Sequence, residues 1–311
     1  MQGTVVKSTG SWYRVMLETG ADVQAKAGNN LRLKGSKTTN PIAVGDKVNL
    51  NVESVDGVSI IYEILPRNNY IIRRSVNLSR QEQIIAANID TVFVVATIAS
   101  PRTSPGFIDR VLCTAEAYKI DVVIVLNKTD IYTPDETELM NAYAYLYRSI
   151  GYKVLTVSAT TGFGLEALKS EMKDRVSLFT GHSGVGKSSL LNAISPNLDI
   201  KIGKISDVHQ KGTHTTTFAE MHPLDFGGYI IDTPGIKEFG VIDLDKNEVG
   251  YYFPDLFALL PQCKFSNCIH ENEPGCAVRK AVTEHRIAES RYTSYLSILN
   301  SEDLMEDWEK D

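Results

Sequence analysis

Residues 181–188 have the residue types and spacing of a phosphate-binding loop. The segment reads Gly-His-Ser-Gly-Val-Gly-Lys-Ser, follows an apolar strand pattern and is followed directly by helical spacing, a context that a chance glycine-rich turn would lack. Its glycines allow backbone N–H groups to turn toward phosphate oxygens, and the N-terminus of the next helix favours negative charge. Lys187 is expected to reach the β- and γ-phosphates, and the Ser188 hydroxyl is expected to bind Mg²⁺. The candidate nucleotide-binding residues here are Gly181, His182, Ser183, Gly184, Val185, Gly186, Lys187, Ser188 and Ser189.

A second polar segment, Asn127-Lys128-Thr129-Asp130, stands at the end of the apolar run 121–126. It resembles the guanine-reading NKxD motif of the GTPase superfamily, whose aspartate accepts hydrogen bonds from the guanine ring N–H and exocyclic amine. Adenine does not offer these donors, so the carboxylate would stay unpaired against it, at a cost of about 1–3 kcal/mol or more. The resemblance implies that Lys128 lies along the base plane, that Asn127 supports the phosphate loop and that Asp130 selects guanine.

The tripeptide Ser158-Ala159-Thr160 follows the next strand pattern, residues 153–157. It resembles the GTPase loop whose alanine amide meets the guanine oxygen, which assigns Ala159 and its neighbour Ser158 to the same site. Each short motif is weak alone. Because both follow consecutive strands, where α/β sheets bind ligands, the expected ligand is a guanine nucleotide, GTP or GDP.

The segment Asp232-Thr233-Pro234-Gly235 follows the apolar run 229–231 and resembles switch II of GTPases. The resemblance implies that Asp232 holds a Mg²⁺-bound water and that the Gly235 amide senses the γ-phosphate. Ras-like enzymes position the attacking water with a glutamine directly after this glycine. Ile236 stands in that place here, and an apolar side chain cannot orient water, so the group must come from elsewhere.

Residues 212–217, Gly-Thr-His-Thr-Thr-Thr, resemble switch I, where one threonine completes the Mg²⁺ shell. Thr216 is the predicted ligand and Thr215 the alternative, although elsewhere such a segment would be a hydroxyl-rich surface turn. His214, beside these threonines, is the first candidate for the group that positions water. A surface histidine without a catalytic role is the competing interpretation.

The order of these motifs is circularly permuted, because the base-reading segments precede the phosphate loop and both switches. Ordinary GTPases place the phosphate loop and the switches first. A permutation moves only the chain ends and need not change the topology of the sheet. Switch II therefore leads directly into the cysteine-rich C-terminal residues, and a movement that depends on the γ-phosphate would be passed straight to them.

Four potential metal ligands form a Cys-x4-Cys-x-His-x5-Cys pattern, at Cys263, Cys268, His270 and Cys276. Three thiolates and one imidazole favour tetrahedral zinc. Because the set fills every coordination position, it predicts a structural Zn²⁺ that folds a small region with little core of its own. The alternatives are unrelated buried thiols with a surface histidine, or His285 in place of His270 from within a predicted helix.

The positioning elements divide the chain into three predicted domains. Residues 1–66 carry short strand patterns and predict a β-barrel of the oligonucleotide-binding (OB) type, although other small barrels fit nearly as well. Residues 67–242 alternate strands with helices, which predicts an α/β phosphate-loop GTPase domain with a mostly parallel sheet. Residues 243–311 predict a mainly helical zinc-binding domain. The strand patterns cover residues 4–6, 13–17, 47–52, 59–64, 91–96, 121–126, 153–157, 177–180 and 228–231, and the helical patterns cover 107–118, 137–150, 165–175 and 281–299.

The formal net charge of −6 is concentrated at the C-terminal end, because residues 301–311 hold six acidic residues and one lysine. The rest is close to neutral, and Lys26, Arg32, Lys34 and Lys37 lie in a stretch without acids. On charge alone this stretch is interpreted as a solvated loop. The N-terminus lacks the features of a signal peptide, and the apolar runs are too short for a bilayer. The sequence thus predicts a cytoplasmic monomer without a membrane partner.

The expected barrel, the permuted motifs and the Cys/His pattern together resemble the bacterial ribosome small subunit-dependent GTPase A family over nearly the whole chain. The resemblance implies a GTP hydrolase (EC 3.6.1.-) that acts late in maturation of the 30S subunit, binds its 16S rRNA and is stimulated by it. It also implies Mg²⁺ and one structural Zn²⁺ as cofactors, and it makes the barrel with its basic stretch the RNA-binding module. Gly184 stands where potassium-activated relatives have asparagine, which argues against potassium dependence.

Three other functions fit parts of the sequence. A GTP-regulated binding module would use hydrolysis only to reset a switch, and would differ from an enzyme mainly in rate. A zinc-delivering GTPase would need exchangeable ligands, which a complete four-ligand set disfavours. A phosphate-loop kinase is disfavoured by the NKTD and DTPG segments, which are features of switch GTPases.

Overall fold

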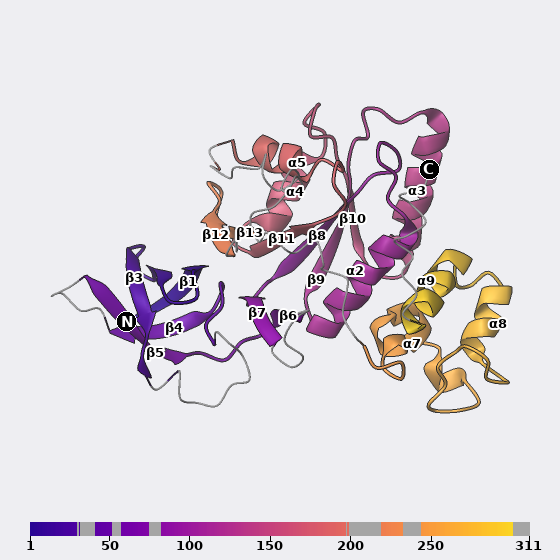
Figure 1. The fold of residues 1–311 in the computed structure, drawn as a ribbon. Coiled ribbons are helices and arrows are strands. Elements are labelled where there is room, and N and C mark those ends of the chain that lie inside the picture. The colour runs from indigo at the N-terminus through magenta and orange to yellow at the C-terminus, as the bar shows by residue number, and fades with distance from the viewer. Residues whose placement is uncertain are drawn as a thin grey trace, which may run out of the picture. The chain divides into compact units, whose positions relative to one another are not determined.

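The structure is a computed structural model of the 311-residue chain (Figure 1). It describes residues 1–29, 31, 41–51, 57–74, 82–196, 198, 219–232 and 244–300. The chain forms two compact units, and each is assembled from three separate stretches. The first unit holds residues 1–92, 166–179 and 194–236, and the second holds residues 93–165, 180–193 and 237–311. The predicted domain boundaries after residues 66 and 242 stay a prediction.

The N-terminal strands close into a five-stranded barrel, as the strand patterns predict. The strands are β1 (Gln2–Ser8), β2 (Tyr13–Leu17), β3 (Asp22–Ala27), β4 (Lys47–Asn51) and β5 (Val58–Ile64). Strands β1, β2 and β3 pair antiparallel in sequence, β3 pairs in parallel with β5, and β4 pairs antiparallel with both β5 and β1. This closed order confirms the OB-like barrel, in which β3 is a strand that no predicted range covered.

The barrel buries alternate side chains of its strands, as expected where one face of each strand lines a core. In β2 the exposure alternates between buried and half-buried along Tyr13–Leu17. Val5, Val15, Leu50 and Ile61 have no exposed surface and belong to one core cluster. The hydrophobic pattern of the sequence therefore determines which face of each strand points inward.

The first unit continues beyond the barrel with further strands. A two-stranded hairpin of β6 (Tyr70–Arg74) and β7 (Glu82–Ala87) follows, which the sequence did not predict. Strands β11 (Val176–Thr180) and β13 (Tyr229–Asp232) pair in parallel, and β12 (Glu220–Pro223) pairs antiparallel with β13. Strand β12 also pairs with β1 at Lys7 and Glu220, whose side chains form a 2.7 Å ion pair.

The second unit contains the α/β elements that carry the base-reading segments. Strand β9 (Asp121–Leu126) lies between β8 (Thr91–Ala96) and β10 (Lys153–Thr156) and pairs in parallel with β10. Every residue of β8 is buried, as its continuous apolar pattern predicts. Among the described residues of the second unit, the α/β helices are α2 (Pro105–Tyr118), α3 (Pro134–Ser149) and α5 (Lys187–Ile194), and α4 (Leu165–Met172) belongs almost wholly to the first unit.

The starts of α2 and α3 follow from local sequence. Ser104 caps α2 by accepting a hydrogen bond from the Phe107 N–H at 3.2 Å. Thr133 and Glu136 form a reciprocal capping box at the start of α3. A proline also occupies the first turn of each helix, where its missing N–H costs nothing.

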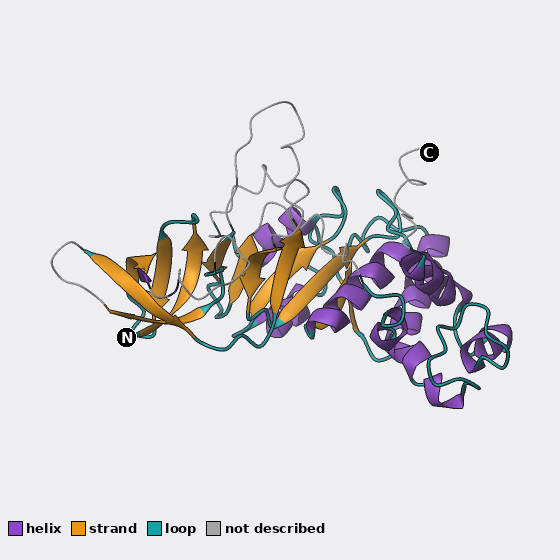
Figure 2. Ribbon diagram, turned by 60° about the horizontal axis from the view of Figure 1, so that its bottom comes forward, coloured by secondary structure: helices purple, strands orange, loops and turns teal. Residues whose placement is uncertain are grey.

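The C-terminal region, residues 244–300, consists of short helices and loops (Figure 2). Its elements are the 3₁₀ helices η2 (Val249–Tyr252) and η3 (Leu260–Gln262) and the helices α7 (Pro254–Phe257), α8 (Ala277–Thr283) and α9 (Glu289–Leu299). The single helix predicted over 281–299 is wrong, because the chain turns between α8 and α9. His285 lies in this turn in a left-handed conformation, with φ 55°, and not in a helix.

The core of the C-terminal region includes a residue from α2. Val249, Phe253 and Tyr295 pack in one cluster with Cys113, which is 2 % exposed on α2. Helix α9 packs along α2, as Figure 1 shows. Among the helices of the described ranges, none combines the length and the hydrophobicity that crossing a bilayer requires.

Candidate nucleotide and metal sites

The phosphate-loop segment connects the end of β11 to the start of α5, as predicted. Gly181, Gly184 and Gly186 all have positive φ, at 145°, 82° and 91°. A Cβ at Gly181 would overlap the Val95 carbonyl oxygen, and one at Gly186 would lie 2.5 Å from Asn127 Nδ2. These glycines are therefore required both by backbone conformation and by the close approach of neighbouring loops.

The side chains of this loop divide into buried and accessible ones. Val185 is fully buried, whereas Ser183 and Gly184 are exposed. The Lys187 ammonium donates to the carbonyls of Gly181 and His182, both at 2.7 Å. This cation is held at the loop, where it could interact with a phosphate. Ser188 and Ser189 follow it in the first turn of α5.

Asn127 brings the three predicted nucleotide-binding segments together. It is 1 % exposed, and its Nδ2 donates to the Val185 carbonyl of the phosphate loop at 2.9 Å. Its Oδ1 accepts from the Ala159 backbone amide at 3.4 Å. The backbone amide of Asn127 donates to the Ala96 carbonyl at the end of β8. One amide side chain thus connects the phosphate loop with the two base-reading segments.

The carboxylate of Asp130 is held by its neighbour across the site. Ser158 is fully buried, and its hydroxyl donates to Asp130 Oδ1 at 2.6 Å. The Ser158 hydroxyl oxygen itself accepts from the Thr161 amide at 3.1 Å, which fixes the direction of the hydroxyl. Asp130 is exposed, so this oriented carboxylate could accept N–H donors from a ligand.

A loop that the sequence did not single out, residues 97–104, borders these segments. Its Ser100 carbonyl accepts from the Lys128 ammonium, and Pro101 Cδ would lie 3.3 Å from a Cβ at Gly184. The loop leads into α2, where the Phe107 ring lies 4.0 Å from the His182 ring between centroids. Only the Ser-Pro helix start at 104–105 marked this region in the sequence, and it carries no sign of a ligand.

His182 packs in the phosphate loop as a neutral ring. Burial lowers its pKa, and the nearby Lys187 ammonium lowers it further. At neutral pH the ring is therefore uncharged, and it packs against the Phe107 ring at an angle of 38°.

Several predicted site residues lie outside the described residues. His214, Thr215, Thr216 and Gly235 are among them, and of Asp232 only the backbone is described, as the last residue of β13. Three basic residues of the predicted RNA-binding stretch also lie outside the described residues, namely Arg32, Lys34 and Lys37, and so does the acidic segment 301–311.

The four predicted metal ligands lie close together, as their spacing predicts. They are Cys263, Cys268, His270 and Cys276. Their ligand atoms all lie within 4.8 Å of one another. His270 Nδ1 is 3.6 Å from Cys263 Sγ and 3.4 Å from Cys276 Sγ. Zn–S and Zn–N bonds of normal length at a tetrahedral angle place these atoms about 3.5 Å apart, so the donor set fits zinc. His285 is not part of the group.

The Cys/His group also organises the backbone around it. The Cys276 sulfur accepts from the Arg279 amide at 3.5 Å and thereby caps α8. The Cys263 sulfur accepts from the Ala277 amide at 3.3 Å. Amide donors of this kind stabilise thiolates, the form that binds a metal.

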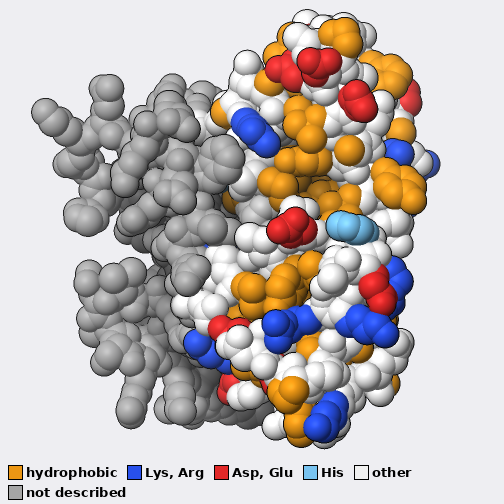
Figure 3. Space-filling view, turned by 90° about the vertical axis from the view of Figure 1, so that its right-hand side faces the viewer, with side chains coloured by type: hydrophobic (Ala, Val, Ile, Leu, Met, Phe, Trp, Pro, Cys, Tyr) orange, Lys and Arg blue, Asp and Glu red, His pale blue; other side chains and the backbone are white. Residues whose placement is uncertain are grey.

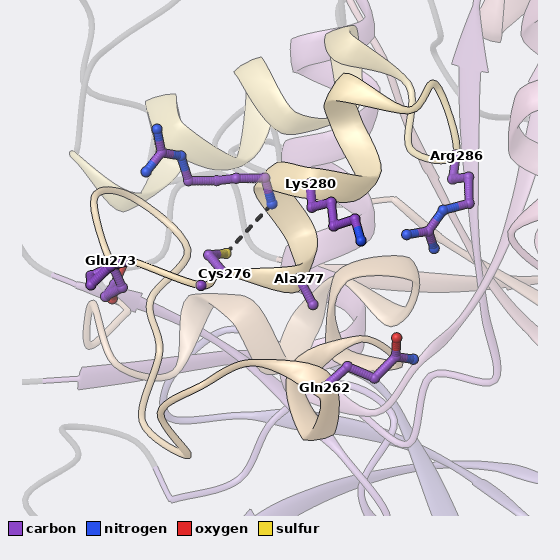
Figure 4. Close-up of a pocket in the computed structure, with 9 residues that line it drawn as sticks. Gln262, Glu273, Cys276, Ala277, Lys280 and Arg286 are labelled. Carbon is purple, nitrogen blue, oxygen red and sulfur yellow. Dashed lines mark hydrogen bonds between the residues drawn. The ribbon is translucent and has the colours of Figure 1, made fainter.

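A pocket of about 450 Å³ lies beside Cys276 (Figure 4). Gln262, Arg279, Lys280 and Arg286 contribute to its lining, and Lys280 and Arg286 both pair with Glu284, at 3.7 and 2.9 Å. In the space-filling view of Figure 3, hydrophobic patches alternate with charged side chains. The exposed aromatic residues of the C-terminal region are Tyr251, Phe257 and Phe265, each 40–50 % exposed.

Comparisons with known proteins agree with this arrangement. Residues 64–242 match the RsgA GTPase family, and residues 2–60 match the RsgA N-terminal domain. A protein of Bacteroides fragilis named small ribosomal subunit biogenesis GTPase RsgA is 53 % identical over 97 % of both chains. The protein of the same name from Flavobacterium johnsoniae is 50 % identical over 97 % of this chain and 94 % of its own.

Two solved structures share the fold along the chain. YjeQ from Thermotoga maritima superposes with a TM-score of 0.80 at 35 % identity, over 96 % of this chain and 97 % of that one. YloQ, described as a circularly permuted GTPase, superposes with a TM-score of 0.74 at 30 % identity, over 96 % and 94 %. Its described permutation matches the motif order of this chain, in which Asn127–Asp130 precede the phosphate loop. The chain therefore belongs to the RsgA GTPase family, and it is a circularly permuted GTP hydrolase.

Proposed function

We propose that this GTPase binds the 30S ribosomal subunit and hydrolyses GTP to GDP and phosphate late in the maturation of that subunit. In this proposal the 30S subunit stimulates the hydrolysis. The observation that supports this most is the convergence of the phosphate loop and both base-reading segments on Asn127, in a chain about half identical to proteins named for small-subunit biogenesis. The proposal includes a cytoplasmic location and action as a monomer.

In this proposal the described residues bind the nucleotide from two sides. Asp130, oriented by Ser158, accepts the guanine N–H groups, and the Ala159 amide donates to the guanine oxygen. Gly181 to Ser189 surround the phosphates with backbone N–H groups, and the Lys187 ammonium neutralises their charge. Lys187 would exchange its two carbonyl partners for phosphate oxygens, which form stronger, charge-assisted hydrogen bonds.

Mg²⁺ is proposed to be held by the Ser188 hydroxyl and Thr216, with Asp232 acting through a bound water. Ser188 lies one residue after Lys187 in the first turn of α5, and Asp232 ends the strand β13 that pairs with the strand before the loop. When bound, the ion would neutralise the charge that develops between the β- and γ-phosphates. Thr215 is the alternative ligand.

The group that positions water is proposed to be His214. Ile236 cannot take this role, and the half-buried His182 has a lowered pKa and packs its ring against Phe107. Replacing His214 with alanine should abolish stimulated hydrolysis while GTP binding persists. Stimulated turnover that stays normal in this variant would remove His214 from the mechanism.

The barrel is proposed to contact 16S rRNA. Trp12 is 40 % exposed between β1 and β2, and the Lys26 ammonium lies 4.0 Å from the centre of its ring. An aromatic face beside a cation suits unpaired RNA, because bases stack on the ring and phosphates attract the charge. Lys26 also belongs to the basic stretch that precedes β4.

The Cys/His group is proposed to hold one structural Zn²⁺. Cys263, Cys268, His270 and Cys276 fill all four tetrahedral positions, which leaves no site for a substrate. Chelation separates this role from zinc delivery: loss of folded structure supports a structural ion, whereas reversible transfer to an acceptor protein supports delivery.

Turnover with ribosomal subunits tests the central proposal. The purified protein is assayed with GTP alone, with added 30S subunits and with added 50S subunits, and ATP serves as a control for the base. Slow turnover that rises sharply with 30S alone is the expected result. Turnover indifferent to 30S would leave a GTPase whose partner is not the small subunit.

A further inference from the structure

The Tyr132 hydroxyl lies between two segments that border the nucleotide site. Tyr132 is half-buried in the loop between β9 and α3, two residues after Asp130. Its hydroxyl donates to the Asn127 carbonyl and accepts from the Ile98 amide at 3.0 Å. It therefore joins the turn Asn127–Asp130 to the loop 97–104.

Both ends of this connection are buried backbone groups. Asn127 is 1 % exposed and Ile98 is 5 % exposed. Burial raises the pKa of Tyr132, while the hydrogen bond from Ile98 opposes the shift, so the phenol keeps the proton that it donates to Asn127. Without this hydroxyl, one N–H and one carbonyl would lose their partner together.

Besides the Tyr132 hydroxyl, the backbone of this turn is held by the Asn127 amide on the Ala96 carbonyl at 2.9 Å and by the Ile131 amide on the Lys128 carbonyl at 3.1 Å. Neither of these bonds involves the Asn127 carbonyl, which the Tyr132 hydroxyl binds. Lys128 adopts a left-handed conformation with φ 66°, and the Thr129 amide reaches the Val157 carbonyl only at 3.3 Å. The Lys128 ammonium donates to the Ser100 carbonyl of the same loop 97–104. Loop and turn are thus linked at two points, one through Tyr132 and one through Lys128.

We propose that Tyr132 is a positioning residue that holds the Asn127–Asp130 turn in the geometry that reads guanine. The inference rests on the proposed role of this turn in base binding. Tyr132 does not contact the nucleotide in this proposal. It fixes the main chain of Asn127, whose side chain bonds the phosphate loop, and thereby the position of the Asp130 carboxylate.

The test replaces Tyr132 with phenylalanine, which keeps the ring and removes only the hydroxyl. The control is Tyr145→Phe on α3, where the ring is 77 % exposed. Tyr132→Phe removes both hydrogen bonds of the hydroxyl. We expect it to raise the GTP KM and the GDP Kd about tenfold, the effect of one hydrogen bond lost between the displaced Asp130 and guanine, and to change kcat less than KM. Tyr145→Phe should match the parent protein.

Base discrimination separates positioning from a general loss of stability. ITP lacks the exocyclic amine from which Asp130 is proposed to accept a hydrogen bond. A displaced Asp130 loses this interaction with GTP, so the ratio of the ITP KM to the GTP KM should fall in Tyr132→Phe. A purely structural role would raise both KM values equally, and such a parallel rise would overturn the inference, as would unchanged KM values.

Asp130→Asn distinguishes failure of this inference from failure of the proposed site. If that variant retains the parent preference for GTP over XTP, the turn does not read the base and the proposed role of Asp130 fails. If it shifts the preference toward XTP while Tyr132→Phe binds GTP normally, the site stands and only the inference about Tyr132 is wrong.

Discussion

The barrel and the C-terminal region are both small, but different interactions hold them together. The barrel is a closed sheet whose core residues, such as Val15 and Leu50, alternate along its strands. The C-terminal region has short helices and buries polar groups, among them His270 and Arg291 at 1 % exposure each. The barrel therefore relies mainly on apolar contacts, whereas the C-terminal region adds two polar centres to an apolar core of its own.

Arg291 is the second of these centres. From α9 it donates to Asp109 of α2 at 2.7 Å and to Asp255 of α7 at 2.8 Å. Its guanidinium also lies 4.5 Å from the centre of the Phe253 ring. Although burial opposes its charged form, the two carboxylates raise the pKa of Arg291, so it remains a cation. The C-terminal region is thereby anchored to α2, the helix whose first turn contacts the phosphate loop through Phe107.

The largest expected effect follows from removing a metal ligand with Cys276→Ser. The zinc proposed for this group should fall from one per chain to nearly none. Residues 244–300 should then lose their protection from hydrogen exchange, while the barrel keeps its own. Structural zinc contributes about 10–16 kcal/mol in small domains, as much as a domain's whole stability. Metal analysis and hydrogen-exchange mass spectrometry measure the two results.

Cys113→Ala is the matched control for this prediction. Cys113 packs in the same core cluster but is not among the four ligands. This variant should keep its zinc and the protection of the C-terminal region. If Cys276→Ser instead retained full protection, the region would be held by its apolar core, as the barrel is, and the contrast between the two would disappear.

A smaller effect is expected from Arg291→Met, which leaves the buried Asp109 and the partly buried Asp255 without their cation. Breaking a buried pair in this way costs about 3–5 kcal/mol, measured as a lower free energy of unfolding in urea. Adding Asp109→Asn should restore part of the loss, since it removes one of the unpaired charges. A full loss in Arg291→Met with no recovery in the double variant would show that the lost packing on Phe253 is responsible.

The pH dependence of this variant sharpens the test. Burial raises the pKa of Asp109, and Arg291 opposes that shift. Without Arg291 the carboxyl should take up a proton more readily, and the neutral acid is tolerated inside the protein. A group whose pKa is higher in the folded than in the unfolded state stabilises the folded protein at low pH. This stabilisation is lost as the pH rises through the folded-state pKa. The free energy of unfolding that Arg291→Met loses relative to the parent protein should therefore be larger at pH 8 than at pH 5.

Much of the fold and part of the site could be predicted because the signals are local. The alternation of β1, β2, β4 and β5 predicted the barrel, and the continuous apolar runs predicted β8 and β9. The spacing of Cys263 to Cys276 predicted a group whose ligand atoms do converge. In each case neighbouring residues alone set the pattern, so no knowledge of the rest of the chain was needed.

What could not be predicted depends on contacts between distant segments. Arg291 and Asp109 are 182 residues apart, and nothing near either one indicates the other. The turn between α8 and α9 places His285 in a left-handed conformation, which a sequence usually signals with glycine. The Tyr132 hydroxyl binds the Ile98 amide, 34 residues away. Such interactions leave no period and no motif in the sequence, because the fold alone brings them together.

The smallest predicted effect concerns an ion pair at the edge of the barrel, between the partly buried Arg67 and the buried Asp46. Arg67, just after β5, donates to Asp46 at 2.6 and 2.7 Å and to the Pro41 carbonyl at 2.7 Å, and Asp46 is fully buried. Arg67→Met should lower the free energy of unfolding by about 1.5–3 kcal/mol, the value of charged hydrogen bonds.

The barrel should nevertheless remain closed in Arg67→Met, because its apolar core and strand pairing do not involve this side chain. Urea unfolding measures the loss, and hydrogen exchange shows whether β1 to β5 stay protected. Lys169→Met, which breaks an exposed pair with Glu166 on α4, is the control and should change stability by at most about 0.5 kcal/mol. Loss of protection throughout the barrel would mean that one polar centre controls this domain as well, and the barrel would then resemble the C-terminal region in how it is held.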